Sequence, residues 1–251
     1  MEIDFTFPLE GKIAIVTGGS SGIGRAIAEA FSSKGVTVAI ADLQLDNAKD
    51  FAAQLGNNAS AHFCDVTSID SIRSAVSEII SLHHNVDILV NSAGIVALAP
   101  AENLKKSAWD LTISVNLTGT FLMSQEVGKL MLQRQRGKII NLASQAGTIA
   151  LHEHAAYCAS KFGVIGITKV LASEWAGRGV TVNSISPTVV LTDLGKKAWN
   201  GEKGDNLKKL IPTGRFAIPE EIAATAIFLA SEASNMINGA DILVDGGYTI
   251  R

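Results

Sequence analysis

Short apolar runs alternate with longer amphipathic segments along the whole chain. Seven of the runs are nearly continuous in apolar residues and have the length of buried β-strands rather than helices. The predicted strands span residues 12–18, 36–42, 59–65, 86–94, 137–144, 180–187 and 241–247. Because these runs lack a polar face, we expect helices to cover both faces of the sheet.

The segments between these strands show the spacing of apolar residues that is typical of helices. Examples of these predicted helices are residues 22–34, 69–83, 103–133, 156–176 and 219–231. The last begins with Pro219, Glu220 and Glu221, which suit the positive end of a helix dipole. The alternation predicts an α/β fold with a doubly wound parallel sheet of about seven strands. The chain has no low-complexity linker, so we expect one domain over residues 1–251.

Composition and charge narrow the class of protein. The chain has 251 residues, is 47% apolar and 18% charged, and carries a formal net charge of -3. Its Lys and Arg residues are scattered, which argues against nucleic-acid and anionic-membrane partners and favours a small-molecule substrate. The N-terminus lacks the pattern of a secretory signal, and no apolar run reaches the roughly 18 residues of a membrane span. We therefore expect a cytoplasmic protein.

Cysteine and histidine give no metal prediction. Cys64 and Cys158 are the two cysteines, they lie far apart, and they form neither a disulfide framework nor a zinc-binding spacing. His152 and His154 form an H-x-H pair without a third ligand nearby, which is more typical of a loop than of a metal site.

The first predicted strand runs directly into the glycine-rich segment "TGGSSGIG". Gly18, Gly22 and Gly24 would let the backbone approach a pyrophosphate at the N-terminus of the next helix. The spacing is G-x-x-x-G-x-G rather than G-x-G-x-x-G, but a strand precedes it and a helix follows, as a dinucleotide site requires. The segment therefore predicts a dinucleotide cofactor.

Asp42 ends the second predicted strand, where a carboxylate can accept hydrogen bonds from the adenosine ribose. A carboxylate there would repel a 2′-phosphate. Ser21 and Leu43 occupy neighbouring positions at which a basic residue would neutralise that phosphate. These residues predict NAD rather than NADP.

The segment "YCASK" places Tyr157 and Lys161 one helical turn apart, on one face of the predicted helix. By itself, such a pair is usually a half-buried aromatic and a solvated lysine. A phenol has a pKa of about 10, and a lysine charge at about 4 Å would favour its phenolate by about 4 kcal/mol, or about 3 pKa units. The pair therefore also fits a general base.

A series of motifs decides between the structural and the catalytic interpretation of Tyr157 and Lys161. "TGGSSGIG", Asp65–Val66, "NSAG", "SVNLTG", Ser144, "YCASK", "NSISP" and "VDGGY" resemble, in order and spacing, the motifs of the short-chain dehydrogenase/reductase family. The resemblance covers almost the whole chain. It implies a single-domain Rossmann fold, a metal-free hydride transfer between NAD and a secondary hydroxyl, and a homotetramer.

The resemblance also assigns site residues. The implied catalytic residues are Asn116, Ser144, Tyr157 and Lys161. Tyr157 would move the hydroxyl proton, Ser144 would hydrogen-bond the substrate oxygen, Lys161 would also contact the nicotinamide ribose, and Asn116 would hold a relay water. With the glycine-rich segment, the expected cofactor contacts are Gly18, Ser20, Ser21, Gly22, Ile23, Gly24, Asp42, Leu43, Asp65, Val66, Asn91, Ala93, Gly94, Tyr157, Lys161, Pro187, Val190, Thr192 and Leu194.

Two positions depart from the family pattern. The usual "NNAG" is "NSAG" here, so Ser92 replaces an asparagine, and we expect only local hydrogen bonding to change. The usual "PG" is Pro187–Thr188 here. Because threonine disfavours positive φ, the backbone conformation near the nicotinamide could differ from that of the family.

Substrate contacts are expected from Ser144, Gln145, His152, His154 and Tyr157, under a mobile lid over residues 189–215. The polar residues between Ser144 and Tyr157 suit a polyhydroxylated substrate, although two or three of them could face solvent. Several segments resemble bacterial sugar-alcohol dehydrogenases such as those for galactitol, arabitol and threitol. We therefore expect a polyol as substrate.

Two alternative functions remain, and a third is excluded. A 3-oxoacyl carrier-protein reductase would share the catalytic residues but would favour NADP and a basic docking patch. A non-catalytic nucleotide-binding scaffold could share the fold. A zinc-dependent alcohol dehydrogenase is excluded by the missing cysteine ligands. For the tetramer, the sequence itself shows only that the helices at 103–133 and 156–176 have surplus apolar positions, which a single core would also explain.

Overall fold

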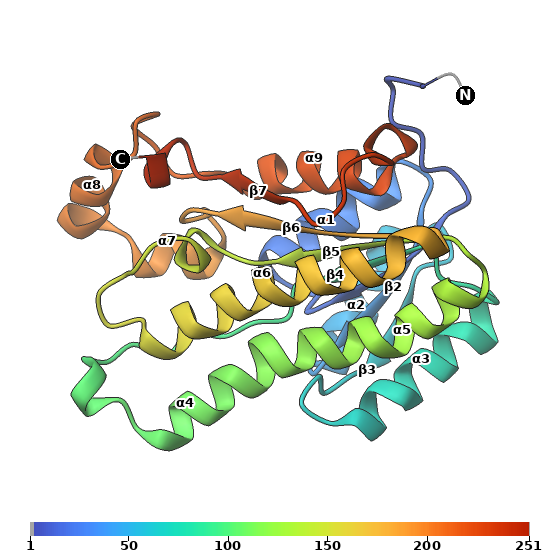
Figure 1. Cartoon of the computed structure of the whole chain (residues 1–251), viewed down its shortest axis with the longest axis horizontal. Coiled ribbons are helices and arrows are strands. Elements are labelled where there is room, and N and C mark those ends of the chain that lie inside the picture. Colours follow the sequence, from blue (N-terminus) through green and yellow to red (C-terminus); the bar gives the residue numbers. More distant parts are fainter. Residues whose placement is uncertain (1–2, 251) are drawn as a thin grey trace.

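The computed structural model describes residues 3–250 and contains one parallel sheet (Figure 1). The strands lie in the order β3-β2-β1-β4-β5-β6-β7, so the chain reverses its direction of winding between β1 and β4. The parallel seven-stranded prediction is confirmed. The strands are β1 (Ile13–Thr17), β2 (Thr37–Asp42), β3 (Ser60–Phe63), β4 (Ile88–Asn91), β5 (Gly137–Leu142), β6 (Val180–Pro187) and β7 (Asp241–Val244).

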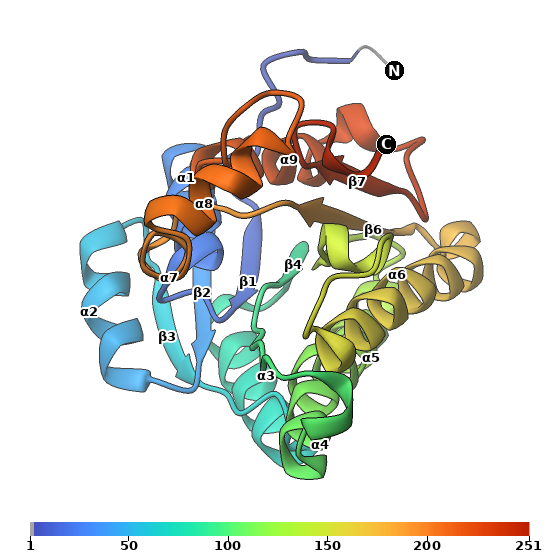
Figure 2. The same cartoon turned by 90° about the vertical axis from the view of Figure 1, so that its left-hand side faces the viewer.

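Helices cover both faces of the sheet, as Figures 1 and 2 show from two directions. One face carries α1 (Gly22–Ser33), α2 (Leu45–Leu55) and α9 (Pro219–Ala230), and the other carries α3 (Ile69–His83), α5 (Thr120–Gln133) and α6 (Ala155–Trp175). Alternate strand residues face the two layers: Val16 packs in the core with α1, and Ile15 packs in the core with α3. This explains why the strands are apolar throughout.

The segment predicted as one helix at 103–133 is divided. It contains α4 (Lys106–Ile113), a π-helical turn η2 (Ser114–Gly119) and α5. Asn116 lies inside the π-helical turn, a feature that is frequent at functional sites. Short 3₁₀ helices are η1 (Ala101–Asn103), η3 (Gln145–Gly147), η4 (Ala176–Arg178), η5 (Glu232–Ser234) and η6 (Tyr248–Ile250).

The segment predicted as a lid is partly helical. It contains α7 (Asp193–Ala198) and α8 (Gly201–Lys209), and its ends are anchored by a parallel bridge between Val190 and Ala217. Ile211, within this segment, and Phe216, just after it, are buried. Mobility of the residues between these anchors stays a prediction.

One described segment, Ala155–Arg178, is long and apolar enough to cross a membrane, with a mean hydropathy of 1.2 over its most apolar stretch. Lys161, Lys169, Glu174 and Arg178 interrupt it, so it is not the uninterrupted apolar run that the sequence analysis looked for. The segment includes α6, and Val164, Leu171 and Trp175 of that helix are buried in the fold. Its apolar character is therefore explained in part by its packing on the sheet.

Candidate active site

A cavity of about 410 Å³ lies at the carboxyl ends of β1, β4, β5 and β6. This is the edge of the sheet where the winding reverses, and open α/β sheets bind their ligands there. The cavity is lined by Gly18, Ser21, Gly22, Ile23, Ser92, Ala93, Gly94, Ile95, Val96, Leu142, Ala143, Ser144, Tyr157, Lys161, Pro187, Thr188, Thr192, Asp193 and Leu194.

The glycine-rich loop forms one wall of the cavity and has no room for a side chain at Gly18 or Gly24. Gly18 has φ +61°, and a Cβ on it would lie 2.9 Å from the Cα of Ala93. A Cβ on Gly24 would lie 2.5 Å from the carbonyl oxygen of Gly18. Gly22 has φ +57°, which disfavours other residues, although a Cβ on it would lie 3.6 Å from Thr192 Cγ2, at ordinary contact distance. The loop therefore presents bare backbone to the cavity at Gly18 and Gly22, next to Ser21 and Ile23.

The same loop leads into the N-terminus of α1. Ser21 is the N-cap residue but makes no capping bond with its side chain. Within residues 3–250, the amide of Arg25 is the first in α1 with a backbone acceptor, the carbonyl of Ser21. The preceding amides and the positive end of the helix dipole are therefore free to bind an anion such as a pyrophosphate. These features fit a dinucleotide cofactor.

Asp42 is fixed at the end of β2, with 8% of its surface exposed. The amide and hydroxyl of Ser20 donate to its Oδ2 at 3.1 and 2.6 Å, and the amide of Gln44 donates to its Oδ1 at 2.9 Å. Oδ2 therefore accepts two hydrogen bonds already, whereas Oδ1 keeps one lone pair for a further donor. Leu43 beside it is 61% exposed and carries no charge.

Ser144, Tyr157 and Lys161 converge on the cavity from η3 and α6. The Nζ of Lys161 lies 5.5 Å from the ring centroid of Tyr157 and donates to the carbonyl oxygen of Leu142 at 2.6 Å. Lys161 is 6% exposed, whereas Tyr157 is half-buried. Ser144 begins η3, and its hydroxyl oxygen accepts from the amide of Ala146 at 3.1 Å. The predicted phenol, hydroxyl and ammonium thus share one site.

The expectation that Lys161 lowers the pKa of Tyr157 is wrong for this structure. Burial raises the pKa of the Tyr157 phenol, and its hydrogen bond with Ser144 opposes that effect. Burial also lowers the pKa of Lys161 to about 8. The prediction assumed a fully charged lysine, but the low-dielectric surroundings disfavour the ammonium and the phenolate alike.

Asn116 lies outside the cavity lining and links two of the segments that form it. It is fully buried, and its Oδ1 accepts from the amide of Ile95 at 2.8 Å. Its Nδ2 donates to the carbonyl of Ile95 at 2.9 Å and to Ser160 at 3.1 Å. Both amide hydrogens are therefore used by the protein, so a relay water could bind Asn116 only through an acceptor lone pair. Asn116 fastens the chain after β4 to α6.

Several predicted cofactor residues do not line the cavity: Ser20, Gly24, Asp42, Leu43, Asp65, Val66, Asn91 and Val190. Asp42 and Leu43 end the neighbouring strand, and Asp65 follows β3. Asn91 points into the core instead, where its Nδ2 donates to Ser124 at 2.9 Å and to Asn141 at 2.8 Å. The side chain of Asn91 therefore links β4 to β5 and α5, and its predicted contact with the cofactor stays a prediction.

The predicted substrate wall is only partly present. His152 and Glu153 are exposed, and neither histidine lines the cavity. His154 lies edge-on to Tyr157, with ring centroids 6.0 Å apart. The placement of His152 in the wall was wrong, because residues 151–154 form a surface turn before α6. Gln145 is 4% exposed, and its Oε1 has no hydrogen-bond partner among residues 3–250.

The two departures from the family pattern are accommodated. The amide of Ser92 donates to Thr17 Oγ1 at 3.0 Å, so β1 holds this turn. Thr188 does not have positive φ, and its amide donates to the carbonyl of Val244 at 3.2 Å. Its hydroxyl is buried and, within the described chain, unpartnered. Thr188 was not among the predicted site residues, although its departure from the family's Pro-Gly pattern distinguishes this position in the sequence. Ile95 and Val96 also line the cavity and were not predicted, because no motif distinguishes these two apolar residues in the sequence.

Comparisons with known proteins agree with this arrangement. The chain is 59% identical to D-threitol dehydrogenase of Mycolicibacterium smegmatis, over 100% of the chain and 98% of that protein. It is 50% identical to an NAD-dependent glycerol dehydrogenase of Listeria innocua, over 99% and 98%. It is 36% identical to a 3-oxoacyl-[acyl-carrier-protein] reductase of Thermotoga maritima, over 96% and 99%.

Solved structures show the same fold. A gluconate 5-dehydrogenase from Burkholderia cenocepacia, crystallised with NADP and tartrate, superposes with a TM-score of 0.94 at 34% identity, over 98% of both chains. A family model described as enoyl-(acyl carrier protein) reductase matches residues 18–249. The chain belongs to the short-chain dehydrogenase/reductase family.

Proposed function

We propose that this protein is an NAD-dependent oxidoreductase that interconverts a secondary hydroxyl of a sugar alcohol and the corresponding ketose. The observation that carries the proposal is the convergence of Ser144, Tyr157 and Lys161 on the cavity that the glycine-rich loop also lines. The similarity to threitol and glycerol dehydrogenases supports the substrate class.

NAD is favoured over NADP by Asp42. Its carboxylate is held by Ser20 and Gln44 at the end of β2, where a ribose hydroxyl can donate to the remaining lone pair of Oδ1 and a phosphate would be repelled. Leu43 and Ser21 supply no cation that would offset this repulsion. When bound, the nicotinamide supplies the chemistry of hydride transfer.

The chain's own groups handle the proton. In oxidation, Tyr157 Oη takes the proton of the substrate hydroxyl, and Ser144 Oγ donates to the oxygen as it becomes a carbonyl. Lys161 lies 5.5 Å from the centre of the phenol ring and, with a pKa of about 8, is largely protonated at neutral pH, so its charge offsets part of the cost that burial imposes on the phenolate. In ketose reduction, the protonated phenol that burial favours is the form needed.

One buried oxygen of the cavity suits a substrate with several hydroxyls. Thr188 lines the cavity after β6, and its Oγ1 has no partner among the described residues. Gln145 Oε1 is also unpartnered, but Gln145 does not line the cavity. A buried oxygen without a partner costs stability until a donor reaches it. A polyol brings further hydroxyl donors beside the reacting carbon, and a simple alcohol does not.

The second candidate function is reduction of a 3-oxoacyl thioester. The 36% identical reductase supports it, as does the apolar pair Ile95 and Val96 in the cavity wall. Asp42 and the net charge of -3 weigh against NADP and against docking of an acidic carrier protein.

We also propose a homotetramer. Large apolar side chains are exposed on α4, α5 and α6, and such patches are typical of subunit interfaces. They are Trp109, Leu111, Phe121, Phe162 and Val170, each at least 37% exposed. A cytoplasmic location stays a prediction from the sequence.

A substrate screen tests the proposed function. Purified protein is assayed with NAD or NADP against sugar alcohols of increasing length and simple secondary alcohols, and in reverse with a 3-oxoacyl thioester. We expect a polyol with NAD to give the highest kcat/KM. A preference for the thioester would keep the chemistry and overturn the polyol, and no turnover with any substrate would overturn both.

A further inference from the structure

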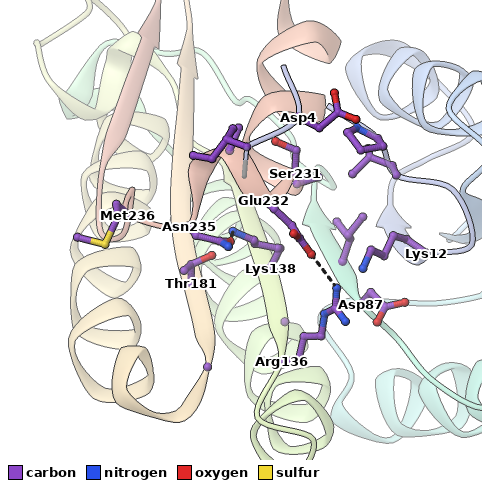
Figure 3. A pocket seen from close by; sticks show the side chains of 18 of the residues that line it. Asp4, Lys12, Asp87, Arg136, Lys138, Thr181, Ser231, Glu232, Asn235 and Met236 are labelled. Atoms are coloured by element: carbon purple, nitrogen blue, oxygen red, sulfur yellow. Dashed lines mark hydrogen bonds and ion pairs between the residues drawn. The ribbon is translucent and has the colours of Figure 1, made fainter. Parts of the chain in front are cut away.

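A second and larger cavity, of about 840 Å³, lies at the opposite end of the sheet, where the strands begin (Figure 3). Its wall is formed by the segment before β1, the starts of β4, β5 and β6, and the residues after α9. The cavity is within the size range of small-molecule sites. None of the residues assigned above to the reaction lines it.

Three basic side chains from two chain segments line this cavity: Lys12, Arg136 and Lys138. Lys138 donates to Asn235 Oδ1 at 2.7 Å and to Ser234 Oγ at 3.4 Å, both of which are neutral. Within residues 3–250, neither Lys12 nor Lys138 has a carboxylate oxygen within the 4.0 Å of an ion pair. Two ammonium groups in the wall therefore lack a counter-ion.

Most acidic side chains of the wall are engaged elsewhere. Asp87 accepts from the amide of Ile13 at 3.0 Å and from Arg134 at 3.1 Å. The carboxylate of Asp4 accepts from the amide and hydroxyl of Thr6 at 2.8 and 2.7 Å.

Glu10 is exposed, and its side chain lies against Gly35. Glu232 remains, and it pairs with Arg136 at 3.2 Å. Its side chain is 64% exposed, so this ion pair contributes little and a stronger anion can compete with it.

Burial is the main cause that lowers the pKa of Lys138 to about 8. The charge on Glu232 opposes this shift, and the smaller effects of the charges on Arg136 and Lys12 add to it. A bound anion would relieve the repulsion among these groups. The hydroxyl of Thr181 lies in the same wall, buried and without a partner among the described residues, and can supply a neutral donor.

We propose that this cavity binds the phosphate group of a small metabolite, with Lys12, Arg136 and Lys138 as its cationic contacts. Arginine and lysine together give a phosphate both directed N–H donors and compact charge. Glu232 is an internal competitor for the same cations. The site lies beyond the start of β5, whereas Lys161 binds the carbonyl at the end of that strand. Occupancy and hydride transfer therefore use different residues.

Calorimetric titration with inorganic phosphate tests the proposal. The protein is first saturated with NAD, so that the glycine-rich loop is filled, and ionic strength is held constant with chloride. We expect Lys138→Met to weaken binding about tenfold or more, since it removes a charged hydrogen-bond donor. Glu232→Gln should strengthen binding, because it removes the competing carboxylate. Lys49→Met, an exposed charge on α2, is the control and should leave the affinity unchanged.

Several outcomes would overturn the proposal. They are the absence of phosphate binding, equal affinity in all four proteins, or weaker binding in Glu232→Gln. If Lys138→Met does not fold, Lys12→Met takes its place with the same expected direction. A sugar phosphate that binds more tightly than inorganic phosphate at this site would identify an ester as the source, and equal affinity would identify free phosphate. Altered sedimentation of Lys138→Met with unchanged phosphate affinity would make the cavity a subunit contact instead.

Discussion

Lys138 and Lys161 lie at opposite ends of strand β5, and burial lowers the pKa of each to about 8. Lys161 faces the smaller cavity, beside a phenol, a serine hydroxyl and the N-terminus of α1. Lys138 faces the larger cavity, among other cations and neutral acceptors. The volumes, about 410 and 840 Å³, do not indicate which end carries out the reaction. The smaller cavity is identified as the active site by its groups: Tyr157 as proton donor, Ser144 as donor to the substrate oxygen, and the glycine-rich loop for the cofactor.

The largest expected effect separates the two ends directly. Tyr157→Phe should reduce kcat by about 10²–10⁴-fold, because the ring is kept and the proton-transferring oxygen is lost. NAD affinity should be retained, as measured by fluorescence titration. Lys138→Met is the matched control and should keep wild-type turnover. A Lys138→Met variant that fails as severely as Tyr157→Phe would remove the distinction between the ends.

A second change tests the cofactor side of the active cavity. The double variant Asp42→Ala, Leu43→Arg should shift the ratio of kcat/KM values toward NADP by about a hundredfold, or about 3 kcal/mol. It removes a repulsive carboxylate and adds a cation for the 2′-phosphate. Steady-state kinetics with both cofactors measures the ratio. An unchanged ratio would show that cofactor choice does not depend on the end of β2.

A third change concerns the unpartnered hydroxyl oxygen of Thr188 in the cavity wall. Thr188→Val should lower kcat/KM for a polyol about tenfold, because the valine has the same shape and cannot bond a substrate hydroxyl. A simple secondary alcohol should react as before with this variant. If both substrates lose activity equally, Thr188 supports the fold of the site and does not select the substrate.

The smallest expected effect is on stability at the other end. The folded pKa of Lys138 is about 8, below the ordinary lysine value of 10.5, so the cost of burying its charge is full below pH 8 and is relieved as pH rises toward 10.5. Lys138→Met should therefore be more stable than wild type at pH 7 by about 1 kcal/mol, after screening and the lost bond to Asn235. Denaturant unfolding should show this gap closing by pH 10. A gap that widens with pH would contradict the sign.

The sequence predicted the fold well because apolar periodicity and parallel crossovers are local and repetitive signals. It missed the π-helical turn around Asn116, since nothing in the spacing of apolar residues distinguishes that turn from a continuous helix.

For the site, the sequence brought together the residues that motifs fix in order, such as Ser144, Tyr157 and Lys161. It failed where the outcome depends on burial. The direction of the Tyr157 pKa shift and the exposure of His152 follow from tertiary packing, which spacing along the chain does not contain. The buried hydroxyl of Thr188 is a further example, because its lack of a partner is a property of the surrounding core.

The most direct test of the proposed function follows the hydrogen on the reacting carbon. Wild-type protein is incubated with NAD and a sugar alcohol that carries deuterium on its secondary carbinol carbons, and the products are analysed by mass spectrometry. We predict that deuterium appears in the reduced nicotinamide and that a ketose forms in equal amount, with neither product formed by Tyr157→Phe. Reduced cofactor without deuterium, or full product formation by Tyr157→Phe, would contradict hydride transfer at the carboxyl end of the sheet.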